Sequence, residues 1–361
     1  MTKTKTIYTY LLILLLTAVS VALPAHAEEP AQATQMPVMA GLTTAAQAAE
    51  YLRSLAFGTF REEQSEEYDI TMNGTADGVD ARAMLFYACG GFTDWVAFGE
   101  RVASGLCDER LFDHFSYTGT VDGRNGNYRS ENVSVTILEG RVSDSDYFLA
   151  DIYIQDISCF VTAFSSEEFM GDSKTVGSML DTIPGAIIGM NGDYYSNNVY
   201  GPVVRNGQTY VSRVSGYWDI ALLDSAGVLT TYPYGKLKKA ALKEMDAYQT
   251  WVFGPALLDE YGHAKTQFRS NVLPRNPRSV LGYYEPGHYA FLLVDGRSET
   301  CDGITMSDLS QFCEDLNFTC AYNMDGGQSS AMIAQDGFVD NPFRNGRPVS
   351  DILAIREVPE E

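Results

Sequence analysis

The sequence predicts an α+β fold, in which a domain built on a mixed β-sheet follows a small helical module. Two observations indicate this division. Apolar residues recur at helical spacing through much of residues 46–112, where Gly90 and Gly91 separate two helical segments. From about residue 127 the pattern changes to short β-branched and aromatic runs separated by turn residues, which is typical of strands. The chain therefore divides into a helical part and a larger, strand-rich part.

The first 27 residues have the pattern of a secretory signal peptide. Lys3 and Lys5 precede the apolar segment 7–23, and small residues then predict cleavage after Ala27. Because the apolar segment approaches the length of a membrane-spanning helix, an uncleaved anchor is the alternative. The sequence contains no other long apolar run. We therefore expect a secreted or cell-surface protein with no stable membrane span after cleavage.

The region between the signal peptide and the sheet domain divides in two. Residues 28–45 are rich in Ala, Pro, Gln and Thr, and we interpret them as a linker. Residues 46–118 form the predicted helical N-terminal module. Its aromatic residues Trp95, Phe98 and Phe86 are interpreted as core side chains rather than a sugar-stacking platform. The main domain is expected over residues 127–358.

Charge and cysteine content limit the possible partners. The formal net charge is −22, which argues against a nucleic-acid partner because nucleic-acid binding needs a basic surface. An anionic substrate must therefore be held by a few local Arg or Lys side chains. The six cysteines permit three disulfides in an exported protein, although Cys159 lies in a strand-like run and is interpreted as a buried thiol. No zinc or EF-hand spacing is present, so no cofactor is predicted, while a divalent cation is left possible.

Polar residues and glycines follow several strand-like runs. The run 186–190 leads into Asn191, Gly192 and Asp193, and the run 290–294 leads into Asp295 and Arg297. The run 320–324, which contains Asn323, leads into a further set: Asp325, Gly326, Gly327, Ser329 and Ser330. Arg278, beside Pro277, begins another strand-like run. Since loops at strand ends build pockets on a rigid sheet, we expect these residues to form a site.

The last of these segments resembles the C-terminal signature of the phosphodiester glycosidase family. The family pattern is approximately N-x-D-G-G-x-S-S, a strand, a turn and R-P-V-S, and it matches Asn323 to Ser330 followed by Arg347 to Ser350. Bacterial members of this family are often associated with exopolysaccharide biosynthesis. The chain departs from the family at Asp193, because the usual N-G-G-F-F run has a second glycine there. The Asp193 carboxylate is therefore interpreted as catalytic, as substrate-binding or only as a turn cap.

The resemblance implies an exported hydrolase that cleaves the glycosyl C–O bond of a sugar-1-phosphodiester in a cell-envelope or extracellular glycan. Its partner is therefore a glycan or a glycosyl-phosphodiester substrate. The candidate catalytic residues are Asp325 as base or nucleophile, Arg278 as the phosphate anchor, and the carboxylates Asp193 and Asp295. The candidate substrate-binding residues are Asn191, Gly192, Arg297, Asn323, Gly326, Gly327, Ser329 and Ser330.

Three alternatives remain open at this stage. Asp325 could only cap the turn of a hairpin, because Asp-Gly is a common turn dipeptide. The run Gly327 to Ala331 is a near match to the G-x-S-x-G motif of a serine hydrolase. All the histidines, His26, His114, His263 and His288, lie upstream of that run, which disfavours this reading. The third alternative is a non-catalytic glycan-binding or exopolysaccharide-assembly protein on the same fold.

Overall fold

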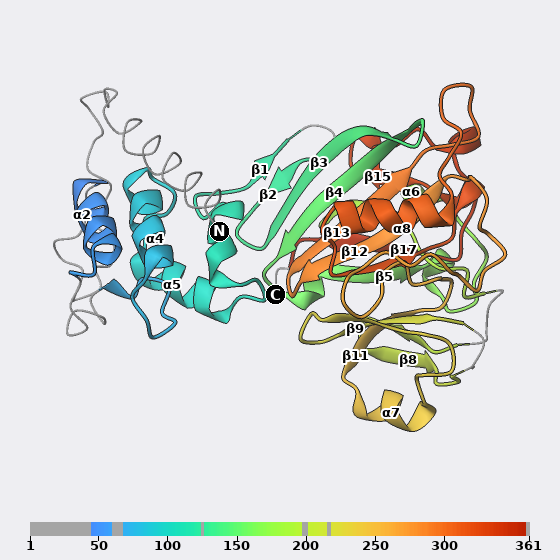
Figure 1. Cartoon of the computed structure of the whole chain (residues 1–361), viewed down its shortest axis with the longest axis horizontal. Coiled ribbons are helices and arrows are strands. Elements are labelled where there is room, and N and C mark those ends of the chain that lie inside the picture. The colour runs from blue at the N-terminus through green and yellow to red at the C-terminus, as the bar shows by residue number, and fades with distance from the viewer. Residues whose placement is uncertain (1–44, 60–67, 124–125, 197–200, 215–217, 359–361) are drawn as a thin grey trace.

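The computed structural model describes residues 45–59, 68–123, 126–196, 201–214 and 218–358. The predicted signal peptide and almost all of the predicted linker lie outside these residues. Figure 1 shows a helical N-terminal module at one end of a larger, strand-rich body, which confirms the predicted α+β class. In the part of the chain that is described, no helix is both long and apolar enough to cross a membrane.

The described part of the N-terminal module contains short helices. They are α2 (Ala45–Ala56), α4 (Gly78–Ala88), α5 (Trp95–Ser104) and the 3-10 helix η2 (Glu109–His114). Asp77 and Asp94 accept hydrogen bonds from backbone amides in the first turns of α4 and α5, which fixes where each helix begins. The predicted break after α4 is confirmed, and Gly90 has the positive φ of +80° that this turn requires. Trp95 and Phe98 are buried in the core of the module, as predicted.

Two antiparallel sheets form the main body. The larger sheet has the strand order β1-β2-β3-β4-β13-β12-β14 and the other has the order β16-β15-β6-β17-β5. The bounds of the larger sheet's strands are β1 Val121–Asp122, β2 Tyr128–Arg129, β3 Val133–Val142, β4 Ser145–Ile154, β13 His288–Val294, β12 Arg278–Glu285 and β14 Cys320–Asn323. Those of the other sheet are β16 Gly337–Phe338, β15 Met332–Ala334, β6 Ala186–Asn191, β17 Asp351–Arg356 and β5 Phe160–Phe164.

Smaller elements are attached to this body. One small sheet has the order β10-β9-β11, and β7 pairs with β8. Their bounds are β7 Val203–Arg205, β8 Gln208–Val211, β9 Ile220–Asp224, β10 Leu229–Tyr232 and β11 Ala247–Trp251. The short helices among these and the main strands are η3 Ile157–Cys159, η4 Ser165–Glu167, α7 Lys239–Glu244, η5 Gly327–Ser329 and η6 Phe343–Asn345.

The core of the body lies between the two large sheets. Apolar side chains from both sheets meet there, including Leu281 and Phe291 from one and Met190 and Leu353 from the other. Helix α8 (Met306–Asp315) covers the outer face of the larger sheet, and α6 (Val176–Leu180) packs against the other sheet. Thr305, the N-cap of α8, accepts a hydrogen bond from the backbone amide of Asp308.

The segment that contains Asp325 passes from one sheet to the other. Strand β14, which precedes it, belongs to the larger sheet, whereas β15, which follows it, belongs to the five-stranded sheet. The hairpin alternative is therefore wrong, because β14 and β15 are not paired with each other. The turn at residues 335–336 does connect a hairpin, since β15 pairs with β16.

The structure shows all six cysteines as free thiols, so the expected disulfides are not formed. The reason lies in the packing. Cys107, Cys159 and Cys313 are buried in separate apolar clusters. The interpretation of Cys159 as a buried thiol is confirmed, and burial raises the pKa of this thiol to about 12.

Candidate functional site

The candidate site lies where the two large sheets meet around the segment 324–331. Asn191 ends β6 and Asp325 follows β14, so the two predicted strand ends come from different sheets. Arg278 is the first residue of β12, beside β14 in the same sheet. The expectation that several strand ends approach one another is met for these three residues.

Asn191 holds the two sheets together at this point. Its side-chain Nδ2 donates to the backbone oxygen of Asp325 at 2.7 Å. Its Oδ1 accepts hydrogen bonds from Ser279 Oγ at 2.7 Å and from the amide of Ala331 at 3.2 Å. The residue is 0% exposed, and its polar atoms are engaged within the protein. Asn191 therefore supports the Asp325 segment from within the protein, and its side-chain amide is not free to bind a substrate.

The carboxylate of Asp325 is held by three donors. Its Oδ1 accepts from the Gly326 amide at 2.9 Å, while its Oδ2 accepts from Ser329 Oγ at 2.6 Å and from Arg347 Nη2 at 3.0 Å. Arg347 also donates from Nε to Ser329 Oγ at 2.6 Å. Asp325 is thus fixed in orientation by its own loop and by a guanidinium from the segment before β17.

Arg347 is a site residue to which the sequence interpretation assigned no role, although the R-P-V-S run that contains it was part of the motif. Its side chain is 39% exposed, and its guanidinium carbon lies 5.4 Å from the ring centre of Tyr194. The sequence signal that could have found it is its place in the same family motif as Asp325 and Ser329. The separation of 22 residues from Asp325 hid this contact from local reasoning.

Arg278 is buried without an acidic partner. Its side chain is 2% exposed and donates to three backbone oxygens, those of Val272, Pro274 and Ile304. No carboxylate of the described residues forms an ion pair with it, and its Nη1 has no hydrogen-bond partner among them. Burial and the nearby charge of Arg297 lower the pKa of Arg278 to about 10. The guanidinium still carries its charge at neutral pH.

Arg278 and Asp325 line the same small hollow, which has a volume of about 90 Å³. A volume of this size holds several water molecules or one small anionic group. The described residues that line it are Phe253, Val272, Asn276, Arg278, Arg297, Asp325, Gly326 and Gly327. Five of the predicted site residues are therefore in its wall, and Asp325 is the only carboxylate among the described residues that line it.

Two of the predicted substrate-binding residues have backbone amides that are already used within the protein. The Gly326 amide donates to Asp325, and the Gly327 amide donates to the backbone oxygen of Pro277 at 2.9 Å. The donors that remain at the hollow are guanidinium groups. Arg297 donates from Nε and Nη2 to Asn276 Oδ1, which places its guanidinium beside Gly327.

The other predicted polar residues lie around the hollow rather than in its wall. Asn323 donates from Nδ2 to the oxygen of Gly254 at 2.8 Å, and its Oδ1 is buried with no partner in the described part of the chain. Ser330 Oγ is also buried and without such a partner. Ser329 acts through Asp325 and Arg347, as described above. None of these three side chains lines the hollow.

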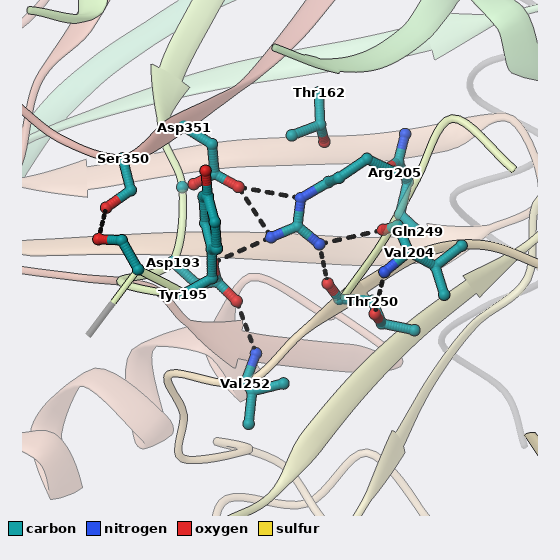
Figure 2. A network of polar contacts seen from close by, with 12 residues as sticks. Thr162, Asp193, Tyr195, Val204, Arg205, Gln249, Thr250, Val252, Ser350 and Asp351 are labelled. Carbon is teal, nitrogen blue, oxygen red and sulfur yellow. Dashed lines mark hydrogen bonds and ion pairs between the residues drawn. The ribbon is translucent and has the colours of Figure 1, made fainter. Parts of the chain in front are cut away.

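Asp193 belongs to a buried charge network (Figure 2). Figure 2 shows the Arg205 guanidinium between the carboxylates of Asp193 and Asp351, with distances of 3.0 Å to Asp193 Oδ1 and 2.7 Å to Asp351 Oδ2. Asp193 Oδ2 also accepts from the amide of Val252 at 2.9 Å. Burial raises the pKa of Asp193, while the charge of Arg205 opposes that shift. These contacts are those of a structural ion pair, a role that differs from the three considered for Asp193 from the sequence.

Gly192 is required by this network. A Cβ atom at this position would lie 2.2 Å from Asp351 Oδ1, so no larger residue fits without displacing the carboxylate. Gly192 also donates its amide to the backbone oxygen of Asp351 and accepts from the amide of Asp325. The predicted substrate-binding glycine therefore acts as a close-packed link between the Asp325 segment and β17.

Asp295 is held away from the hollow. Its Oδ2 accepts from Asn341 Nδ2 at 3.1 Å, and burial raises the pKa of its carboxyl group to about 6. Asp146, Asp295 and Cys301 bring one potential ligand atom each within 4.8 Å of the others, and no other such group occurs in the described ranges. The Cys301 thiol donates to Asp146 at 3.5 Å, so the group is hydrogen-bonded within the protein. A divalent cation at the site stays a prediction.

Comparison with known protein families identifies the class of this domain. Residues 184–356 match the model of the family described as phosphodiester glycosidase. The matched segment contains every residue that lines the hollow, as well as Asn191, Asp193 and Arg347. The resemblance drawn from the motifs is therefore confirmed, and the family indicates phosphodiester glycosidase activity.

Solved structures give the fold a particular counterpart. The chain is similar to the catalytic domain of zebrafish N-acetylglucosamine-1-phosphodiester alpha-N-acetylglucosaminidase, auto-inhibited by its pro-peptide, with a TM-score of 0.51 and 18% identity. That match covers 63% of this chain and 83% of the zebrafish chain. A hypothetical protein from Synechocystis matches with a TM-score of 0.48 and 12% identity, covering 62% of each chain. No curated protein matches the sequence. At these identities the structural similarity establishes the fold alone.

Proposed function

We propose that this protein hydrolyses the glycosyl C–O bond of a sugar-1-phosphodiester, releasing the free sugar and a phosphate monoester. The observation that carries the proposal is the burial of the Arg278 guanidinium without an acidic partner. It is a buried cation with no carboxylate partner among the described residues, and it lines the same hollow as Asp325 and Arg297. An anionic ligand in the hollow would supply the missing counter-charge.

The charge balance of the site supports a phosphate rather than a neutral ligand. A buried charge is costly unless it is paired, and forked guanidinium donors match phosphate oxygens well. Arg278 and Arg297 both face this small volume, whereas the chain as a whole has a net charge of −22. Two adjacent cations in such an acidic protein form a local anion site that long-range attraction would not provide.

Asp325 is positioned for the reaction at the sugar carbon. It acts either as the base that takes a proton from the attacking water or as the nucleophile of a glycosyl-enzyme intermediate. Most glycosidases need a second carboxylic acid to protonate the leaving group. A leaving phosphate monoester has a second pKa of about 6 and needs little protonation. Arg278 and Arg297 would instead stabilise its developing charge, which fits a hollow whose described wall contains one carboxylate.

We further propose that the protein is exported and acts on a glycan of the cell envelope or the extracellular space. The support is the predicted signal peptide within residues 1–27, with its lysines, apolar segment and small residues before the cleavage site. The association of bacterial family members with exopolysaccharide suggests the same location.

A non-catalytic glycan-binding or assembly protein is the second candidate. The observation that favours it is the use of Asp193 in a buried ion pair, which leaves Asp325 as the single carboxylate at the hollow. The serine hydrolase alternative finds no support in the contacts. Ser329 Oγ bonds to Asp325 and Arg347, and no described histidine contacts Ser329 or Ser330.

The test is an assay of sugar release. The purified protein is incubated with UDP-N-acetylglucosamine and a panel of glycosyl-1-phosphodiesters, with and without EDTA, and free sugar is measured. Asp325→Asn should lower turnover by about 10²–10⁴-fold, because it removes the base or nucleophile while keeping the shape of the side chain. Asp172→Asn, at an exposed carboxylate away from the hollow, serves as the matched control.

The outcomes separate the candidates. Loss of sugar release in a folded Asp325→Asn protein, together with normal release in the control, supports hydrolysis. Wild-type turnover in Asp325→Asn would exclude its catalytic role. No release from any substrate by a well-folded wild-type protein would favour the glycan-binding candidate. Loss of release with EDTA alone would show that a divalent cation takes part.

A further inference from the structure

A second and larger hollow lies where the helical module meets the two sheets. Its volume is about 570 Å³, within the range of roughly 300–1,000 Å³ that is typical of ligand sites. We call it the junction pocket. The described residues that line it come from four segments, namely 116–117 with 119–120, 128 with 130–132, 184–185 and 357–358. Gly185 lies just before β6, whereas Asn191 at the candidate catalytic site ends that strand, so the two sites lie at opposite ends of β6.

The side chains of the junction pocket are rich in hydroxyl groups. Ser116, Thr120 and Ser130 contribute aliphatic hydroxyls, and Tyr117 and Tyr128 contribute phenols. The remaining polar side chains of its wall are Asn132, Glu131 and Glu357. None of the described residues that line it is Lys or Arg. A phosphorylated or carboxylated ligand would therefore meet two carboxylates and no cation in the wall itself, while a neutral polyhydroxylated ligand would find acceptors for its hydroxyl groups.

Glu357 is fixed at the wall of this pocket. Its Oε1 accepts from the Tyr128 hydroxyl at 2.8 Å, and its Oε2 accepts from Asn132 Nδ2 at 3.1 Å. Asn132 Oδ1 in turn accepts from Arg101 Nη2, which belongs to helix α5 of the module. A carboxylate offers about four lone-pair positions, and two are used here. The remaining positions are pre-oriented acceptors for the hydroxyl groups of a ligand.

We propose that the junction pocket binds a neutral saccharide segment. Carboxylate, amide and hydroxyl oxygens accept hydrogen bonds from the sugar hydroxyls, and the tyrosine rings cover apolar sugar surface. A further hollow of about 330 Å³ also adjoins Tyr128, with Asp122, Gln335 and Asp336 in its wall. The two hollows together give room for more than one sugar unit. This binding site is independent of the hydrolytic function proposed for the hollow around Asp325.

The experiment is native affinity electrophoresis of the purified chain in gels that contain soluble neutral polysaccharides. The panel is dextran, yeast mannan, hydroxyethyl cellulose and glycol chitin, with alginate as the anionic control and oligolysine as a cationic competitor. At least one neutral polymer should retard the wild-type protein. Thr120→Trp, at an exposed residue of the pocket wall, should weaken this binding at least tenfold because the indole fills the pocket.

Two control variants make the result specific. Thr118→Trp places the same indole at an exposed residue of the same segment that does not line the pocket, and it should bind like the wild type. Asp325→Asn should also bind like the wild type, because it alters only the other site. Thr120→Trp should release sugar from a small glycosyl phosphodiester at the wild-type rate if the protein is a hydrolase.

Three results would overturn the proposal. The first is the absence of retardation by every neutral polymer. The second is equal retardation of Thr120→Trp and the wild type, with circular dichroism showing both to be folded. The third is binding of oligolysine that competes with no polysaccharide, because the pocket would then recognise a cationic peptide through Glu131 and Glu357.

Discussion

Replacing Arg278 by methionine separates its contribution to folding from its contribution to anion binding. The guanidinium donates to three backbone oxygens, and losing a hydrogen bond costs about 1 kcal/mol. The three lost hydrogen bonds should therefore cost about 3 kcal/mol together. Part of this loss is offset, because a buried cation without a carboxylate partner is itself costly and methionine fills a similar volume. We expect Arg278→Met to fold with a moderately lower midpoint of thermal unfolding.

The assay measures thermal unfolding of the protein in a titration with inorganic phosphate, against sodium chloride at matched ionic strength. A ligand present at ten times its Kd stabilises the folded state by RT ln 11, about 1.4 kcal/mol. For a domain of this size the unfolding midpoint should rise by about 3 °C. The rise should saturate in the wild type and be absent in Arg278→Met.

Arg110→Met is the matched control for this experiment. Arg110 is an exposed arginine of the helical module that pairs with Glu285, and it does not line the hollow. It should keep the full phosphate-dependent rise. The reasoning fails if Arg278→Met shows the same saturable rise as the wild type, or if both variants lose it equally.

Three further predictions concern the surroundings of the hollow. Arg347→Lys keeps the charge but loses the fork that bridges Ser329 and Asp325, so sugar release should fall on the order of 10²-fold with little change in the unfolding midpoint. Arg205→Met leaves two buried carboxylates without a cation. Urea unfolding at pH 8 should show a free energy of unfolding lower by about 3–5 kcal/mol than that of the wild type. The loss should be smaller at pH 5, because a carboxyl group can take up a proton there. Burial raises the pKa of Asp340 to about 8, so the folded state binds this proton more tightly than the unfolded chain does. The unfolding free energy of the wild type should fall as the pH rises from about 4 to about 8, and the Asp340→Asn variant, compared by urea unfolding at pH 5 and pH 9, should show a smaller fall.

Local patterns were sufficient for the elements that carry the site. The break at Gly90 and the short strand before Asp325 were both predicted from neighbouring residues. These features depend on interactions within a few positions along the chain. The same local information placed the polar residues at strand ends, and the family resemblance singled out Arg278, Arg297 and Asp325 among them.

The contacts between strand ends could not be predicted in this way. Asn191 reaches Ser279, Asp325 and Ala331, which are 88, 134 and 140 residues away in sequence. A motif indicates that an asparagine is needed without showing that its amide is used inside the protein. The crossing of the Asp325 segment between the sheets is similarly a property of topology. An Asp-Gly dipeptide looks the same in a hairpin and in a crossover.

The chain departs from the family pattern at Asp193, and the role of this residue depends on its contacts in the folded structure. The usual glycine at this position needs no counter-charge, whereas a buried aspartate does. The structure supplies Arg205, which is shared with Asp351, so two buried carboxylates depend on one guanidinium. Because Gly192 leaves no room for a side chain beside Asp351, the network and the Asp325 segment are packed as one unit. The substitution of aspartate for glycine is therefore tied to Arg205, and it affects the site through the support of Asp325 rather than by adding a second carboxylate to the hollow.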